Sequence, residues 1–216
     1  MEQITTELNI YKNPENAKYM NSYLKLDGIS ELSLGLTVPQ IDSICKTIKT
    51  HDIDLIKNLI KSNIHEQKLI AVRLLKKYSL PDILPIINSE IGTSLNNWAT
   101  VDSLCCKTLK FFVPEIIPIL IKYSKSKNEW KRRISCVSLV NFSKKGTYNQ
   151  VIIEICQNIL NAKPTFRFTH LGVGWVLRDL SISEPERLKL FLEKNKDLMS
   201  SEGYRYATEK LNKSIR

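Results

Sequence analysis

Small residues recur at regular spacing along this chain, and this recurrence restricts the possible folds more than any other feature. They occupy matching places in segments with helical periodicity, roughly 32 to 37 residues apart, which is the period of two-helix repeats. The set is Ala71, Ser103, Ser135, Gly172 and Ala207. A small side chain at each place lets neighbouring helices approach closely. Because a two-helix unit cannot bury its apolar face alone, such units stack into a curved solenoid.

Helical periodicity covers most of the chain, whereas alternating apolar and polar runs joined by hairpin turns are nearly absent. Helix-start signals with proline in the first turn occur four times, and each is predicted to open a helix: Asn13-Pro14, Ser79-Leu80-Pro81, Val113-Pro114 and Glu184-Pro185. We therefore predict an all-α fold, a HEAT-like helical-repeat solenoid (an α-α superhelix) with a concave basic cleft. It is expected to form a single domain over residues 1–216. The alternative is a generic helical bundle with coincidental spacing.

The charge balance is strongly basic. The chain carries 32 lysines and arginines against 22 acidic residues, a formal net charge of +10. An excess of this size favours a polyanionic partner, nucleic acid first and an anionic membrane surface second. The competing interpretation is a lysine-rich surface that is simply solvated.

The cysteines and the N-terminal sequence indicate the cellular compartment in which the protein is expected. The five cysteines form no CxxC pair and have no histidine at metal-ligand spacing, so we expect no metal site: Cys45, Cys105, Cys106, Cys136 and Cys156. An odd number of cysteines without a disulfide framework is typical of a reducing compartment. The first residues do not resemble a signal peptide, and no apolar run approaches the roughly 20 residues needed to span a bilayer. We expect a soluble, cytoplasmic monomer with no organic cofactor and no membrane partner.

The three tryptophans lie in helical segments that also carry charge. Trp98 and Asp102 are four residues apart and therefore share one helix face, and Trp130 precedes Arg133 by three residues. Together with Trp175 they are predicted to build one surface from three helices. The alternative is that the indoles are ordinary core side chains.

Asp102 is a candidate catalytic carboxylate. It lies between the apolar residues Val101 and Leu104, which places it in a groove or in partial burial, where a carboxylate needs a partner or a chemical role. Cleavage of an N-glycosidic bond leaves an oxocarbenium-like sugar that an adjacent anion stabilises. The carboxylate could also position or deprotonate the attacking water. The alternative is an aspartate that only favours the helix dipole.

The densest basic run precedes and opens one helix, where the helix dipole adds positive potential and favours phosphate binding. Its members are Lys122, Lys125, Lys127, Lys131, Arg132 and Arg133. The alternative is a solvated charged face. In another helix, Gly172 and Gly174 each cost about 1 kcal/mol relative to alanine, which predicts close approach of a second helix or of a ligand backbone. Arg178 and Asp179 are interpreted as a structural ion pair.

Five motifs in order resemble the AlkD family of DNA alkylation-repair glycosylases, which are built from HEAT-like repeats. They are NPENA at 13–17 followed by Met20, Tyr23 and Lys25, LGLTVP at 34–39, WATVDS at 98–103, NEWKRR at 128–133 and GWVLRD at 174–179. The resemblance covers nearly the full length. It implies excision of N3- and N7-alkylated purines from duplex DNA without flipping of the base into a pocket.

The resemblance also assigns residues. It implies that Asp102 is the catalytic carboxylate and that Trp98 and Trp175 line the sugar of the lesion. Arg133 would hold the DNA backbone and Tyr23 would assist in the cleft. The basic run and the NEWKRR motif add Arg132 and Lys131 to the expected DNA-binding set, and Trp130 is expected to be structural.

Three positions depart from the family pattern, and they are expected to affect the efficiency of base excision and the preference among lesions. Asn97 stands where some members carry a second tryptophan, and Ala99 replaces an aspartate that often follows the first. Asp42 stands near a position where basic residues are usual. No lysine is assigned as a Schiff-base nucleophile, so the prediction is a monofunctional glycosylase. The alternatives are a catalytically silent DNA-binding relative and a protein-interaction scaffold.

Overall fold

A computed structural model describes residues 2–49 and 52–211 of the chain. Within these ranges the regular secondary structure is helical, with two isolated β-bridges, Leu32 to Ile64 and Ile91 to Leu95, and no strand. The predicted all-α, helical-repeat fold is confirmed. The chain divides into two compact units, residues 1–111 and 112–216. The single domain and the concave basic cleft stay predictions. In the described ranges, no helix has both the length and the apolar character needed to cross a membrane.

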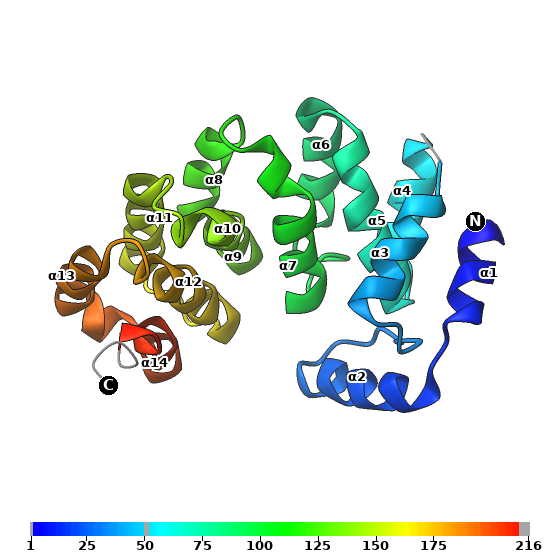
Figure 1. The fold of residues 1–216 in the computed structure, drawn as a ribbon, viewed down its shortest axis with the longest axis horizontal. Helices are drawn as coiled ribbons and strands as arrows, with labels where there is room; N and C mark the ends of the chain where they lie inside the picture. The colour runs from blue at the N-terminus through cyan, green and yellow to red at the C-terminus, as the bar shows by residue number, and fades with distance from the viewer. Residues whose placement is uncertain (1, 50–51, 212–216) are drawn as a thin grey trace. The chain divides into compact units, whose positions relative to one another are not determined.

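The first unit is organised around a central helix, α5, which packs against α3, α4 and α7 (Figure 1). Its core is aliphatic, and Ile41, Ile56, Ile70 and Val101 are fully buried. The helices are α1 (Glu2–Ile10), α2 (Pro14–Leu26), α3 (Val38–Thr47), α4 (Ile53–Ile60), α5 (His65–Leu74), η1 (Leu75–Lys77), α6 (Leu80–Glu90) and α7 (Trp98–Lys107). A 3-10 helix, η2 (Leu109–Phe112), follows.

Local capping explains where several of these helices begin. The Asn13 side chain accepts a hydrogen bond from the Asn16 N–H at 3.0 Å, and Pro14 is the first residue of α2. Asp52 caps α4 in the same manner. At the start of α3, Gln40 reaches back to the Thr37 N–H at 2.8 Å. Side-chain acceptors at these places satisfy backbone N–H groups that have no partner within the helix.

The second unit is organised around α12, which packs against α9, α10 and α14 (Figure 1). Its core is also aliphatic, and Ile134, Ile155, Val173 and Val176 are fully buried. The helices are α8 (Ile117–Ser124), α9 (Glu129–Val137), α10 (Val140–Ser143), α11 (Asn149–Asn161), α12 (Arg167–Leu180), α13 (Pro185–Asn195), η3 (Lys196–Leu198) and α14 (Ser201–Thr208).

One predicted helix start is wrong. Val113-Pro114 does not open a helix, because α8 begins at Ile117 and Pro118 occupies its first turn. The segment from Pro114 to Ile116 forms turns instead. Two prolines four residues apart both fit the start signal, and the sequence pattern did not distinguish them.

The recurring small residues are buried, as close packing of successive helices requires. Ala71, Ser135 and Ala207 are fully buried, and Ser103 is 8% exposed. The Ser103 hydroxyl accepts a hydrogen bond from Arg73 at 2.7 Å. Burial at these positions leaves little room for a larger side chain, as the predicted close packing of helices requires.

The two glycines of α12 are explained by neighbouring helices. A Cβ atom on Gly172 would lie 3.2 Å from Cys136 Sγ of α9, and one on Gly174 would lie 2.6 Å from the Gly203 carbonyl oxygen of α14. The prediction of close helix approach is confirmed at both positions. The two glycines face different kinds of neighbour. Gly172 faces side chains, which can shift by a few tenths of an ångström, whereas Gly174 faces the backbone of α14, which resists displacement.

This difference gives a stability prediction for α12. Gly174→Ala should lower the free energy of unfolding by about 1–3 kcal/mol, because the methyl group overpacks the contact with α14. Gly172→Ala is the matched control, since the gain of about 1 kcal/mol in helix propensity offsets a contact with movable side chains. Urea unfolding followed by circular dichroism measures both variants. Equal stability of Gly174→Ala and the unmodified protein would contradict the tight α12–α14 contact.

Candidate nucleic-acid interface

The start of α7 presents two of the predicted site residues. Asn97 caps this helix, because its side chain accepts a hydrogen bond from the Thr100 N–H at 2.8 Å. Trp98 is the first helical residue and Asp102 follows one turn later. Both side chains are half-buried, whereas Val101 is fully buried. The helix therefore leaves an indole and a carboxylate at the protein surface, four residues apart on one side of α7.

The loop after α2 contacts the start of α7 at two consecutive residues. The indole Nε1–H of Trp98 donates a hydrogen bond to Asp27 Oδ2 at 3.1 Å. The Asn97 side-chain amide donates to both carboxylate oxygens of Glu31, at 3.0 Å each. Two acidic side chains four residues apart thus hold adjacent residues at the first turn of α7.

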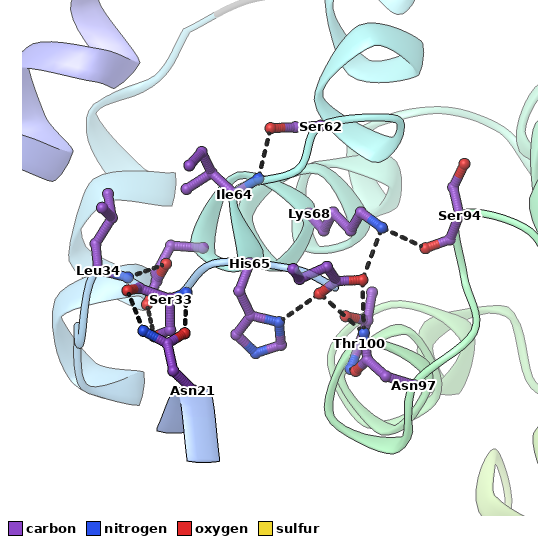
Figure 2. A network of polar contacts seen from close by, with 12 residues as sticks. Asn21, Ser33, Leu34, Ser62, Ile64, His65, Lys68, Ser94, Asn97 and Thr100 are labelled. Carbon is purple, nitrogen blue, oxygen red and sulfur yellow. Dashed lines mark hydrogen bonds and ion pairs between the residues drawn. The ribbon is translucent and has the colours of Figure 1, made fainter. Parts of the chain in front are cut away.

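Glu31 accepts hydrogen bonds from His65, Lys68 and Asn97 in a buried polar network, and Figure 2 labels these three donors. Its carboxylate lies 2.8 Å from His65 Nδ1 and 2.7 Å from Lys68 Nζ, and all three side chains are at least nine-tenths buried. Lys68 also donates to the Ser94 carbonyl oxygen at 2.8 Å, in the segment that leads into α7. Figure 2 shows His65, Lys68 and Asn97 converging from α5 and from the N-terminus of α7. The network ties the loop, α5 and α7 together inside the first unit.

The network controls the ionisation of its central carboxylate. Burial raises the pKa of Glu31, but the hydrogen bonds from His65 and Lys68, together with their charges, outweigh this effect and hold the pKa below its ordinary value of 4.5. A buried carboxylate is tolerated because several donors and a cation compensate its lost hydration. Glu31 is therefore an anion at neutral pH.

Two tyrosines extend the surface along α2. The hydroxyl of Tyr19 donates to that of Tyr23 at 3.1 Å, and their rings make an edge contact with centroids 4.8 Å apart. Both side chains are exposed. The backbone N–H of Asp27 bonds to the Tyr23 carbonyl at 3.1 Å, so Tyr23 lies one turn before the carboxylate that holds Trp98. Sequence reasoning selected Tyr23 and missed Tyr19, although their spacing of four residues was a usable signal.

In the second unit, the start of α9 carries the predicted basic residues. Asn128 caps α9, accepting from the Trp130 and Lys131 N–H groups at 3.0 and 3.2 Å. Arg132 is 8% exposed, and it bonds to the Ser126 carbonyl at 2.6 Å and to Glu129 at 2.8 Å. Its guanidinium is therefore held by the protein itself.

Arg133 is also largely enclosed, with 5% of its surface exposed. Its guanidinium donates to the Phe168 carbonyl and lies 6.0 Å from the centre of that ring. Lys131 is half-buried and lies over the Tyr123 ring. The exposed cations of the basic run are Lys122, Lys125 and Lys127. A DNA-binding role for Arg132, Arg133 and Lys131 stays a prediction.

An aromatic cluster that sequence reasoning missed surrounds Trp130. Its indole stacks on Phe168, with centroids 5.8 Å apart and an interplanar angle of 21°, and meets the edge of Phe166 at 5.0 Å. All three side chains are half-buried. The cluster joins the starts of α9 and α12. The alternation Phe166-Arg167-Phe168 was the available signal, but only the fold brings it to Trp130.

Trp175 lies in the middle of α12 and is half-buried between two buried residues, Gly174 and Val176. One turn later, Arg178 pairs with Asp179 at 3.1 Å and lies 4.7 Å from the centre of the Tyr206 ring. The predicted ion pair is therefore present. These contacts anchor α12 to α14 and leave the Trp175 indole partly accessible.

A family model described as DNA alkylation repair enzyme matches residues 4–211. The chain belongs to the DNA alkylation repair enzyme family. A solved structure from Enterococcus faecalis, described as a predicted DNA alkylation repair enzyme, has a similar fold with a TM-score of 0.73. The two sequences are 18% identical over 91% of this chain and 95% of that one. No curated protein matches the chain.

Asn97 and Asp42 have structural roles in this DNA alkylation repair protein. Asn97 caps α7 with its side-chain oxygen and donates to the buried Glu31 carboxylate with its side-chain N–H, whereas a tryptophan has no side-chain oxygen for the cap. Asp42 forms ion pairs with Arg73 at 2.9 Å and Lys107 at 2.8 Å. Burial raises the pKa of Asp42, but its bonds to Lys107 and Arg73 hold the pKa below 3.8. Both residues stabilise the helices that present the site.

The predicted site residues divide between the two units of this DNA alkylation repair protein. In the first unit, the structure brings together Trp98, Asp102 and, through Asp27, the end of α2 that carries Tyr23. The remaining residues lie in the second unit: Trp175, Lys131, Arg132 and Arg133. The catalytic and binding roles of all of them stay predictions. Among residues 2–49 and 52–211, no group of three or more histidines, cysteines and acidic residues could hold a metal ion.

Proposed function

We propose that this protein is a monofunctional DNA glycosylase that hydrolyses the N-glycosidic bond of N3- and N7-alkylated purines in duplex DNA. The observation that supports this proposal most is the position of Trp98 and Asp102 on one side of α7, where both side chains are half-buried. The chain that carries them belongs to the DNA alkylation repair enzyme family. A carboxylate and an indole face are the two groups best suited to a sugar that becomes cationic.

The reaction follows from the charge of the substrate. An alkylated purine carries a positive charge, so when the bond between C1′ and the base nitrogen breaks, the electron pair leaves with the base and neutralises it. The sugar becomes oxocarbenium-like, and the Asp102 carboxylate stabilises it electrostatically. Water then adds to C1′ and gives up a proton to the carboxylate or to solvent. The products are a free base and an abasic site.

Binding is attributed to the basic surface. A net charge of +10 favours association with a polyanion, and the exposed lysines before α9 offer phosphate contacts. The proposed DNA-contacting set also includes Lys131, Arg132, Arg133 and Tyr23, and the role proposed for Trp175 is contact with the sugar of the lesion. None of the five cysteines, all within the described residues, forms a disulfide bond. This supports action in a reducing compartment such as the cytoplasm. We propose that a monomer acts without a cofactor.

The direct test uses methylated duplex DNA. Incubation with the purified protein, followed by alkaline cleavage of abasic sites and electrophoresis, should give strand breaks at alkylated purines. Omission of the alkali should give no breaks, because no lysine is assigned as a Schiff-base nucleophile. Salt-sensitive DNA binding without abasic product would identify a silent DNA-binding relative. Absence of both binding and product would leave a protein-interaction scaffold.

A further inference from the structure

The hydrogen bond between Trp98 and Asp27 fixes the orientation of a proposed catalytic indole by its polar end. The Asp27 carboxylate accepts the indole N–H at 3.1 Å. Asp27 directly follows the last residue of α2, and its backbone N–H bonds to the Lys25 and Tyr23 carbonyls. The acceptor therefore stands on a backbone that the end of α2 holds in place.

The Asp27 carboxylate makes few other polar contacts within the described part of the fold. Over the part of the chain that the structure describes, the Trp98 indole is its hydrogen-bond donor and no lysine, arginine or histidine forms a salt bridge with it. Asp27 is half-buried, so part of its hydration is lost. An acidic group beside a proposed DNA surface also opposes phosphate, a cost that a binding role would not explain.

We infer that Asp27 is a positioning residue that holds the Trp98 indole in the orientation the reaction requires. This inference rests on the proposed function. A half-buried tryptophan without a polar anchor populates several staggered rotamers, whereas a charge-assisted hydrogen bond to its Nε1–H selects one. The negative acceptor also polarises the indole and makes its face more attractive to a cation, here the oxocarbenium-like sugar. Asp27 acts through Trp98 and does not touch the reacting atoms.

The test is a double-mutant cycle on single-turnover excision from methylated DNA. Asp27→Ala should lower the rate about tenfold and Asp27→Asn about threefold, since the amide oxygen still accepts the N–H but lacks the charge. DNA affinity should stay within about twofold, because the lost interaction orients an indole and does not contact phosphate. In a Trp98→Phe background, Asp27→Ala should cause no further loss, because phenylalanine has no N–H to donate.

The matched control is Asp82→Asn, which removes the same charge from an exposed position on α6 and should keep the full rate. A full excision rate in Asp27→Ala would overturn the inference. The inference would also be overturned if Asp27→Ala lowered the excision rate of Trp98→Phe by the same factor as that of the unmodified protein, because Asp27 would then act independently of the indole.

A second readout does not depend on activity. In a ¹H–¹⁵N spectrum, the Trp98 indole signal, identified by its absence in Trp98→Phe, should move upfield and exchange faster with solvent in Asp27→Ala. If the unmodified protein excises no base but this shift occurs, the proposed function fails while the Asp27–Trp98 bond stands. An unchanged indole signal would refute the bond itself.

Discussion

Asp102→Asn should give a folded protein that releases no measurable N7-methylguanine from methylated duplex DNA. Asparagine has nearly the same shape as aspartate but lacks the negative charge that opposes the cationic sugar. We expect the single-turnover rate to fall by at least about a hundredfold, the scale of losing one preorganised electrostatic group in an active site. Asp102 is half-buried, so the substitution should leave the α7 core contacts of Val101 and Leu104 in place.

The measurement combines base release with a thermal melt of the same preparation. Asp54→Asn is the control, because this residue is exposed on α4 and its side chain pairs only with the surface residue Lys57 in the described contacts. The control should retain full activity. Excision at the normal rate by Asp102→Asn would show that a different group stabilises the sugar, and the assignment of the catalytic carboxylate would be withdrawn.

Glu31→Ala should be the most destabilising substitution in the first unit. It would leave the buried Lys68 ammonium without its carboxylate partner and remove the acceptor for His65 and Asn97. Removing one partner of a buried ion pair typically costs 3–5 kcal/mol, so we expect a loss of about 3 kcal/mol or more in unfolding free energy. Urea unfolding provides the measurement.

Two comparisons sharpen this prediction. Glu31→Gln keeps an oxygen acceptor for Asn97 but removes the charge, so its loss should be smaller than that of Glu31→Ala. The exposed residue Glu193 on α13 is the control, and Glu193→Ala should change stability by less than about 0.5 kcal/mol. Equal stability of Glu31→Ala and Glu193→Ala would mean that the buried network contributes nothing in solution.

The buried network around Glu31 also predicts that the free energy of unfolding depends on pH. The pKa of Glu31 in the folded protein lies below its ordinary value of 4.5. The stabilisation is therefore fully present above about pH 4.5, and it is lost as the pH falls through the lower folded-state pKa. The difference in unfolding free energy between the unmodified protein and Glu31→Gln should shrink as the pH is lowered below this value. A difference that is constant with pH would contradict an ionised Glu31.

Local signals in the sequence determined much of the secondary structure. Asn13 with Pro14, and the prolines that follow Ser79 and Glu184, marked the starts of α2, α6 and α13, because capping and proline act on neighbouring residues only. The spacing of Trp98 and Asp102 placed them on one face of a helix for the same reason. Gly172 and Gly174 predicted close packing of α12, because glycine destabilises a helix and is expected there only where another helix or a ligand approaches the backbone.

The tertiary structure decided what holds those residues in place. Glu31 meets His65, Lys68 and Asn97 across 34 to 66 positions of sequence, and Asp27 meets Trp98 across 71. No local pattern marks such partners, because the packing of α5 against α7 and the path of the loop after α2 set which polar groups are enclosed together. The burial of Arg132 and Arg133 was hidden for the same reason. The sequence by itself determined the helices and the candidate chemistry on α7, and the packing of distant segments decided how that chemistry is supported.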